Sequence, residues 1–381
     1  MRLSVRIALS SLLVVAAAVG ATVSAGRAAA ASAVIGHVYV NDNTAAANTV
    51  AGFDRHADGT LSSIPGSPFA VGGAGTGHGI GSQGALQLSA DGRYLLAADA
   101  GSNQVSILRI KPDGSLTEAE GSPVASGGNE PVSIAVHDDL VYVANAGDGA
   151  SNYTGFTLNA GGHLRPLAGS TFALPDGSSP GDVLFNGDGT RLVGVRVNTS
   201  LIDSFAVRFN GTLTTAPGSP YTAQGLGPFG SEFRPTDPTQ LFVSNAHNGA
   251  GSGTVSAFSV AANGALSSIG ASPYADLQTA PCWVEISHDG KYLFAVNTAS
   301  SSISRYAIAV DGTLTLLGST PFIGKGAFDA RLSPDGTTLW LVEDGSNSVA
   351  AFAVDGGNLT ELATSPTALP AGAAPFGIVV N

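Results

Sequence analysis

The chain has 381 residues, of which 51 are glycine, 44% are hydrophobic and only 12% are charged, and its formal net charge is −12. This composition excludes a coiled coil, which needs many more charged residues, and a disordered acidic segment, which would be far less hydrophobic. No three-residue glycine period occurs, so the chain is not collagen-like, and a turn-rich β protein remains.

Residues 1–33 are predicted to be a secretory signal peptide. Arg2 and Arg6 precede an apolar run over residues 7–25, and small-residue cleavage sites end at Ala25 or Ala33. The alternative is a retained membrane anchor, which the small alanine side chains of the run disfavour. No cysteine follows the run, so a lipoprotein anchor is excluded. We therefore expect a secreted, soluble protein without membrane insertion.

The mature chain is strongly acidic, because loss of the first 33 residues leaves 13 basic and 28 acidic residues, a net charge of −15. Such a surface repels nucleic acid and anionic lipid, so neither is expected as a partner. Cys282 has no second cysteine to pair with and is predicted to be a small buried hydrophobe. A nucleophilic role is the alternative.

From residue 34 onward, a turn of the form [Asp/Asn/Gly]-Gly-x-Leu recurs seven times at intervals of 45 to 55 residues. Most copies are followed by a Gly-Ser-Pro-like stop. Each unit predicts four short strands joined by tight turns, and in the last complete unit these are Asp329–Leu332, Thr338–Val342, Ser348–Val354 and Leu359–Ala363. Seven such units predict an all-β fold, a seven-bladed β-propeller with four-stranded blades.

The two ends of the mature chain match different strands of one blade. His37–Asn41 resembles a second strand, whereas Pro375–Asn381 resembles a first strand. Pairing of these terminal strands would close the ring and leave no free sheet edge. Residues 34–381 are therefore predicted to form one domain, and we expect a monomer.

Three phrases carry a family resemblance: Asp58–Phe69, Gly127–Val136 and Leu140–Gly147 resemble the lactonase family of seven-bladed propellers. This family includes 6-phosphogluconolactonases and 3-carboxymuconate-cyclising enzymes. The resemblance implies lactone chemistry at an axial pocket that holds an Arg, two His and a Glu. At the matching positions this chain has Phe229, Gly230, Gly84 and Ala246, so the acid and base groups of the family are missing there.

Inner strands aligned on their turns place Asp182 and Asp329 opposite each other at the mouth of the axial channel. These carboxylates, together with His78 and His247 in glycine-rich loops on the same face, are the candidate catalytic groups. Candidate ligand-binding residues line the same channel: Phe229, Glu232, Trp283, Glu285, Phe328 and Arg331. The alternative is that the aromatic rings pack between blades and that the acids and histidines are simply solvated. No metal-ligand spacing occurs, and neither a metal nor a cofactor is predicted.

Two functions remain open at this point. One is an exported lactonase-like hydrolase that acts on a lactone or a sugar-acid-like small molecule at the channel mouth. The other is a non-catalytic binding or scaffold propeller, extracellular or in the cell envelope, whose partner is a small molecule or an envelope component.

Overall fold

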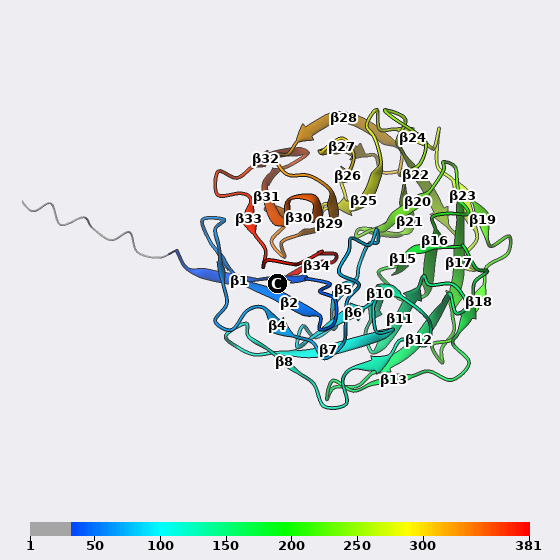
Figure 1. Cartoon of the computed structure of the whole chain (residues 1–381). Helices are drawn as coiled ribbons and strands as arrows, with labels where there is room; N and C mark the ends of the chain where they lie inside the picture. Colours follow the sequence, from blue (N-terminus) through cyan, green and yellow to red (C-terminus); the bar gives the residue numbers. More distant parts are fainter. Residues whose placement is uncertain (1–31) are drawn as a thin grey trace, which may run out of the picture. The chain divides into compact units, whose positions relative to one another are not determined.

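The computed structural model describes residues 32–381, so the predicted signal peptide falls almost entirely outside the described residues. The strands form seven antiparallel sheets that follow one another around a ring (Figure 1). Within the described part, the one helical element is the short 3-10 turn η1 (Asp344–Ser346), and no helix there is long and apolar enough to span a membrane. The prediction of an all-β, seven-bladed propeller is confirmed.

Each sheet takes its strands from one stretch of the chain, except the sheet that contains both ends. That sheet consists of β1 (Val34–Asn41), β2 (Thr49–His56), β3 (Leu61–Ser63), β4 (Phe69–Ala70) and β34 (Ile378–Val380). The next three are β5 (Leu86–Leu88), β6 (Tyr94–Asp99), β7 (Gln104–Ile110), β8 (Leu116–Glu118), β9 (Val124–Ala125); β10 (Pro131–His137), β11 (Leu140–Asn145), β12 (Asn152–Leu158), β13 (Leu164–Pro166), β14 (Phe172–Ala173); and β15 (Pro180–Phe185), β16 (Arg191–Arg196), β17 (Leu201–Val207), β18 (Leu213–Thr215), β19 (Tyr221–Thr222). The last three are β20 (Pro228–Arg234), β21 (Asp237–Asn245), β22 (Thr254–Val260), β23 (Leu266–Ser268), β24 (Tyr274–Ala275); β25 (Pro281–Ile286), β26 (Tyr292–Asn297), β27 (Ser302–Ile308), β28 (Leu314–Pro321); and β29 (Ala327–Leu332), β30 (Thr338–Glu343), β31 (Ser348–Asp355), β32 (Asn358–Glu361), β33 (Thr367–Ala368).

The prediction of four strands per blade holds for only one sheet, that of β25 to β28; the other six sheets have five strands. The difference lies at the Gly-Ser-Pro motif, where the fourth strand breaks and a two-residue strand then pairs again with the third strand. The serine side chain takes over the missing ladder bond: Ser67 Oγ accepts from the N–H of Gly52 at 2.9 Å, and Ser122 Oγ accepts from that of Ile107 at 2.9 Å. The motif is therefore an interruption of the strand and not its end.

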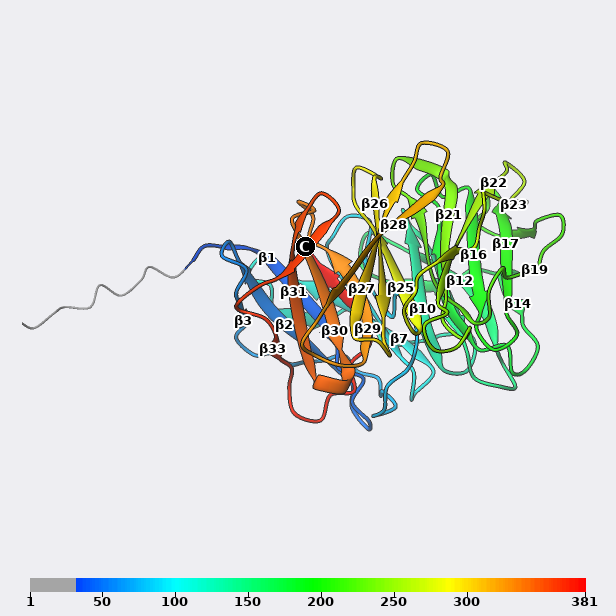
Figure 2. The same ribbon diagram turned by 90° about the horizontal axis from the view of Figure 1, so that it is seen from above.

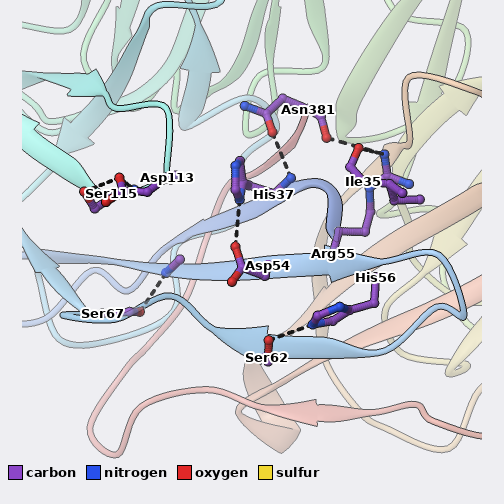
Figure 3. A network of polar contacts seen from close by, with 12 residues as sticks. Ile35, His37, Asp54, Arg55, His56, Ser62, Ser67, Asp113, Ser115 and Asn381 are labelled. Atoms are coloured by element: carbon purple, nitrogen blue, oxygen red, sulfur yellow. Dashed lines mark hydrogen bonds and ion pairs between the residues drawn. The ribbon is translucent and has the colours of Figure 1, made fainter. Parts of the chain in front are cut away.

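Ring closure occurs as predicted, because β34 pairs antiparallel with β1, and Val38, Tyr39 and Val40 lie opposite Val380, Val379 and Ile378. Figure 3 shows the polar contacts around this seam. The backbone N–H of His37 donates to Asn381 Oδ1 at 2.9 Å, and His37 Nδ1 lies 3.1 Å from Asp54 Oδ1.

Apolar side chains of neighbouring blades fill the space between the sheets. Tyr153, Phe172 and Phe205 illustrate this packing: the rings of Phe172 and Phe205 lie 4.8 Å apart, and Tyr153 is fully buried beside them. Seen after a 90° rotation (Figure 2), the strands run across the thickness of the ring, so their ends lie on two faces. On one face each inner strand begins; on the opposite face it ends in a turn.

Candidate functional site

The axis of the ring is filled, on the face where the inner strands begin, by the segment Ser82–Gly84, which we call the axial plug. Gln83 is 3% exposed and contacts three blades. Its backbone N–H donates to Gly181 O at 3.0 Å, and its Nε2 donates to Ser231 O at 3.3 Å and to Val284 O at 3.2 Å. The plug thus replaces an open channel with hydrogen bonds between blades.

Asp182 lies beneath this plug and is 2% exposed. Its carboxylate accepts from the backbone N–H of Ser231 at 3.0 Å, from the Ser231 hydroxyl, and from Ser133 Oγ at 3.2 Å. Burial raises the pKa of Asp182 to about 7, against the opposing effect of these hydrogen bonds. The side chain therefore links three inner strands and does not face solvent.

Asp329 is fully buried and joins the plug to the terminal strand. It accepts from the N–H groups of Gly84 at 3.3 Å, Ile378 at 3.4 Å and Ala330 at 2.8 Å. Burial raises its pKa to about 6. The predicted position of Asp182 and Asp329 at an open mouth is wrong, because the glycine-rich loop before β5 folds into the axis above both. Their catalytic role stays a prediction, and their contacts favour a structural one.

Four rings form a row across three blades. Trp283 lies 5.6 Å from Phe229 and 5.6 Å from Phe328, between ring centroids, and Phe229 lies 6.4 Å from the ring of His247. Trp283 is 1% exposed, and its Nε1 donates to Ser82 O at 2.6 Å. Phe229 is also buried, whereas Phe328 is partly exposed and His247 is exposed. Most of this predicted ligand surface is thus inter-blade packing.

The loop before the plug lies flat on these rings. A Cβ added to Gly79 would come within 2.6 Å of the Phe328 ring, and one added to Gly81 within 2.5 Å of the Phe229 ring. Glycine at these two positions allows the backbone to approach the aromatic row closely.

Three charged side chains come together deeper in the axis, those of Glu232, Glu285 and Arg331. Each lies two residues further along its strand than the level of Asp329, which corresponds to about 7 Å. Glu285 accepts from the N–H of Leu332 at 2.8 Å and lies 3.5 Å from Arg331 Nη1. Glu232 Oε2 is buried without a hydrogen-bond partner among the described residues, and burial and the nearby Glu285 raise the pKa of Glu232. The structure therefore unites three predicted ligand-binding residues, but below the plug.

A pocket of about 250 Å³ opens beside the plug, and we call it the mouth pocket. His78 is exposed there, and the pocket also contains the half-buried Glu130, which sequence reasoning missed. The remaining lining residues are Gly79, Ile80, Gly81, Val132, Ala146, Ser179 and Pro180. The N–H groups of Gly79, Ile80 and Gly81 donate no hydrogen bond within residues 32–381.

The residues that line the mouth pocket therefore include an imidazole, a carboxylate and three N–H groups without an acceptor among residues 32–381. The sequence could have revealed Glu130 by its position, because it directly precedes Pro131, the first residue of β10. At that point a loop reaches the axis. No set of three or more His, Cys, Asp or Glu in the described part of the chain is arranged to hold a metal ion.

Cys282 is buried and unpaired, which confirms its predicted role as a small core residue. Burial raises the pKa of its thiol to about 12, so the thiolate is scarcely populated at neutral pH. The alternative role as a nucleophile therefore has no support.

Stability is expected to fall as the pH rises from about 4 to about 7. Burial raises the pKa of Asp42 and Asp182 to about 7 and that of Asp99, Asp276 and Asp329 to about 6. In this pH window the unfolded chain releases protons that the folded chain retains, which costs up to about 1.4 kcal/mol per group and pH unit. Calorimetry should give a higher Tm at pH 5 than at pH 8, and Asp182→Asn should flatten the slope. A Tm that increases over this range would contradict the assignment.

The family model described as lactonase, seven-bladed β-propeller, matches residues 44–185 and 234–375. The intervening stretch contains Phe229 and Gly230, where this chain departs from the family phrase. No curated protein matches the chain in sequence.

Solved structures with the same fold are only distantly similar in sequence. A proposed 6-phosphogluconolactonase of Bacteroides uniformis has 20% identity over 91% of this chain and 99% of that chain, with a TM-score of 0.72. A protein of Lactobacillus plantarum has 19% identity over 91% and 99%, with a TM-score of 0.71. The periplasmic gluconolactonase of Pseudomonas aeruginosa has 19% identity over 91% and 98%, with a TM-score of 0.68. At these identities the likeness shows the fold alone.

Proposed function

Because the chain belongs to the lactonase family of seven-bladed β-propellers, we propose that it is an exported hydrolase that opens a small, uncharged lactone in the mouth pocket. One observation carries this proposal: His78, Glu130 and three residues whose N–H groups donate no hydrogen bond within residues 32–381 line the same pocket of about 250 Å³. Asp182 and Asp329, in contrast, are covered by the axial plug.

In the proposed reaction, His78 accepts a proton from water as the water oxygen attacks the lactone carbonyl carbon. The N–H groups of Gly79 and Gly81 donate to the developing oxyanion. The ring C–O bond then breaks, and protonated His78 returns the proton to the leaving alkoxide. The product is a hydroxy acid, which releases its proton to solvent. Glu130 would accept a hydrogen bond from a substrate hydroxyl or from the imidazolium.

The charge of the pocket supports an uncharged substrate. Glu130 is its one carboxylate, and its lining includes no Arg or Lys. A phosphorylated lactone would therefore meet a like charge without a compensating cation, which disfavours its binding. A hydroxylated lactone without phosphate has no such conflict.

Export, the monomeric state and a small-molecule ligand in place of nucleic acid or membrane belong to the same proposal. The apolar run after Arg2 and Arg6 supports export. Recovery of the mature chain, starting near residue 26 or 34, from the medium or periplasm would agree with it; an uncleaved cytoplasmic chain would not.

His78→Ala is expected to lower kcat/KM for an unphosphorylated δ-lactone by about 100-fold, the usual effect of losing a general base. His247→Ala is the matched control, because His247 is exposed on the same face but does not line the mouth pocket. Initial rates measured by pH-stat titration give both values. Equal rates for wild type and His78→Ala would contradict the proposed base.

A non-catalytic binding propeller is the second candidate, and one observation favours it. A Cβ added to Gly230, at the position where the family resemblance places a histidine, would lie 2.1 Å from Gln83 Oε1. The plug thus fills the family's axial pocket in this chain. This candidate predicts that lactones raise the Tm of the protein without being hydrolysed faster than in buffer.

A further inference from the structure

A groove of about 590 Å³ lies at the far ends of β6 and β7, on the face opposite the mouth pocket. It is opposite because β5 begins at the axial plug and ends at the turn before β6, and β7 returns to that same end of the blade. Its lining consists of Gly92, Arg93, Arg109, Ile110, Lys111, Pro112 and Thr117. We call it the basic groove.

The charge of the basic groove is opposite to that of the whole protein. Arg93, Arg109 and Lys111 are three of the 13 basic residues of the mature chain, and no acidic residue lines the groove. Arg109 and Lys111 are exposed, and within residues 32–381 neither forms an ion pair or a side-chain hydrogen bond. Two cations are therefore available to a ligand in an otherwise acidic protein.

The third cation is held in place. Arg93 Nη2 lies 2.6 Å from Asp91 Oδ2 and donates to Ala160 O at 3.0 Å. These contacts fix the direction of the guanidinium at one wall of the groove. Fixing one donor in advance lowers the ordering cost of binding a ligand.

A second carboxylate near the groove, that of Asp113, lies in the turn that follows Lys111. It accepts from the N–H of Ser115 at 3.1 Å and from the Ser115 hydroxyl at 2.7 Å (Figure 3). Asp113 is thus engaged within its own turn and does not neutralise the groove by a direct ion pair with Lys111.

We propose that the basic groove binds a compact multivalent oxyanion, a small molecule with two or more phosphate or carboxylate groups. Planar guanidinium groups match such oxyanions with paired hydrogen bonds, and lysine adds a mobile charge. A single exposed ion pair binds too weakly to hold a ligand, whereas a multivalent anion can contact Arg109 and Lys111 together and also reach the guanidinium of Arg93, which is paired with Asp91. This site is independent of the proposed lactone hydrolysis.

Calorimetric titration with pyrophosphate and with citrate at low ionic strength tests the proposal. We expect at least one of them to bind with a Kd of about 1 mM. Tighter binding of pyrophosphate would identify a phosphate ligand, and tighter binding of citrate a carboxylate ligand. The double variant Arg109→Gln/Lys111→Gln should weaken binding at least tenfold, with an unchanged Tm and an unchanged rate of lactone hydrolysis.

Arg165→Gln/Lys325→Gln is the matched control, because it removes the same two charges from exposed positions outside the groove. It should leave the affinity within twofold of wild type. An equal loss in the control, or no saturable binding of either anion to the wild-type protein, would overturn the proposal.

Discussion

Removal of Ile378–Asn381 is expected to leave the protein largely unfolded at room temperature. The three strand residues Ile378, Val379 and Val380 are 0%, 4% and 6% exposed, and each such side chain contributes about 1.5–3 kcal/mol when buried. The truncation also leaves β1 without its pairing partner. A loss of about 5–9 kcal/mol is comparable to the whole stability of a typical domain. Urea denaturation followed by circular dichroism measures it.

Asn381→Ala is the matched control at the same seam. It removes the side-chain acceptor of the His37 N–H but keeps β34, so it should cost only about 1 kcal/mol. If the truncated chain unfolded at the same urea concentration as Asn381→Ala, ring closure by β34 would not be a main source of stability.

Asp182→Ala is expected to destabilise the protein by about 3–5 kcal/mol, because it leaves the Ser231 N–H, the Ser231 hydroxyl and the Ser133 hydroxyl without their buried acceptor. Asp182→Asn keeps the shape and one acceptor and removes the cost of burying a charge. Its destabilisation should therefore be smaller, and smaller at pH 8 than at pH 5. Urea midpoints of both variants at the two pH values measure these effects.

The same variants separate a structural from a catalytic role of Asp182. If Asp182→Ala kept the stability of the wild type and lost lactone hydrolysis, the carboxylate would belong to the reaction after all. The expected pattern is the reverse: Asp182→Asn retains hydrolysis at a temperature where it is folded.

Ring architecture could be predicted from the sequence because local turn chemistry repeats. The turn at Asp58 and Gly59 is an example: Asp58 Oδ1 accepts from the N–H of Thr60, and Gly59 has a φ of 81°. The strands predicted for the last unit agree with β29 to β32 within two residues at each end. The fifth strands were not predicted, because a strand of two residues after the Gly-Ser-Pro break is too short to show alternation of apolar and polar residues.

The site could be predicted only in part, because alignment of strands gives the level of a residue along the axis but not what covers it. Asp182 and Asp329 are at the predicted level, yet Gln83 and its neighbours lie over them. A glycine-rich loop has no local preference that would reveal this position, since its path depends on the aromatic row beneath it. His78 was predicted as a candidate, but Glu130 was not. The two residues come from different blades, and only the folded ring brings them together in one pocket.

A crystal structure of the protein with a δ-lactam, an unreactive analogue of a δ-lactone, tests most directly where the chemistry takes place. If hydrolysis takes place in the mouth pocket, electron density for the lactam ring should lie between His78 and Glu130. The lactam carbonyl oxygen should face the N–H groups of Gly79 to Gly81, and Gln83 should keep its position. Density in the axis, with Gln83 displaced and the lactam against Asp182 or Asp329, would contradict it.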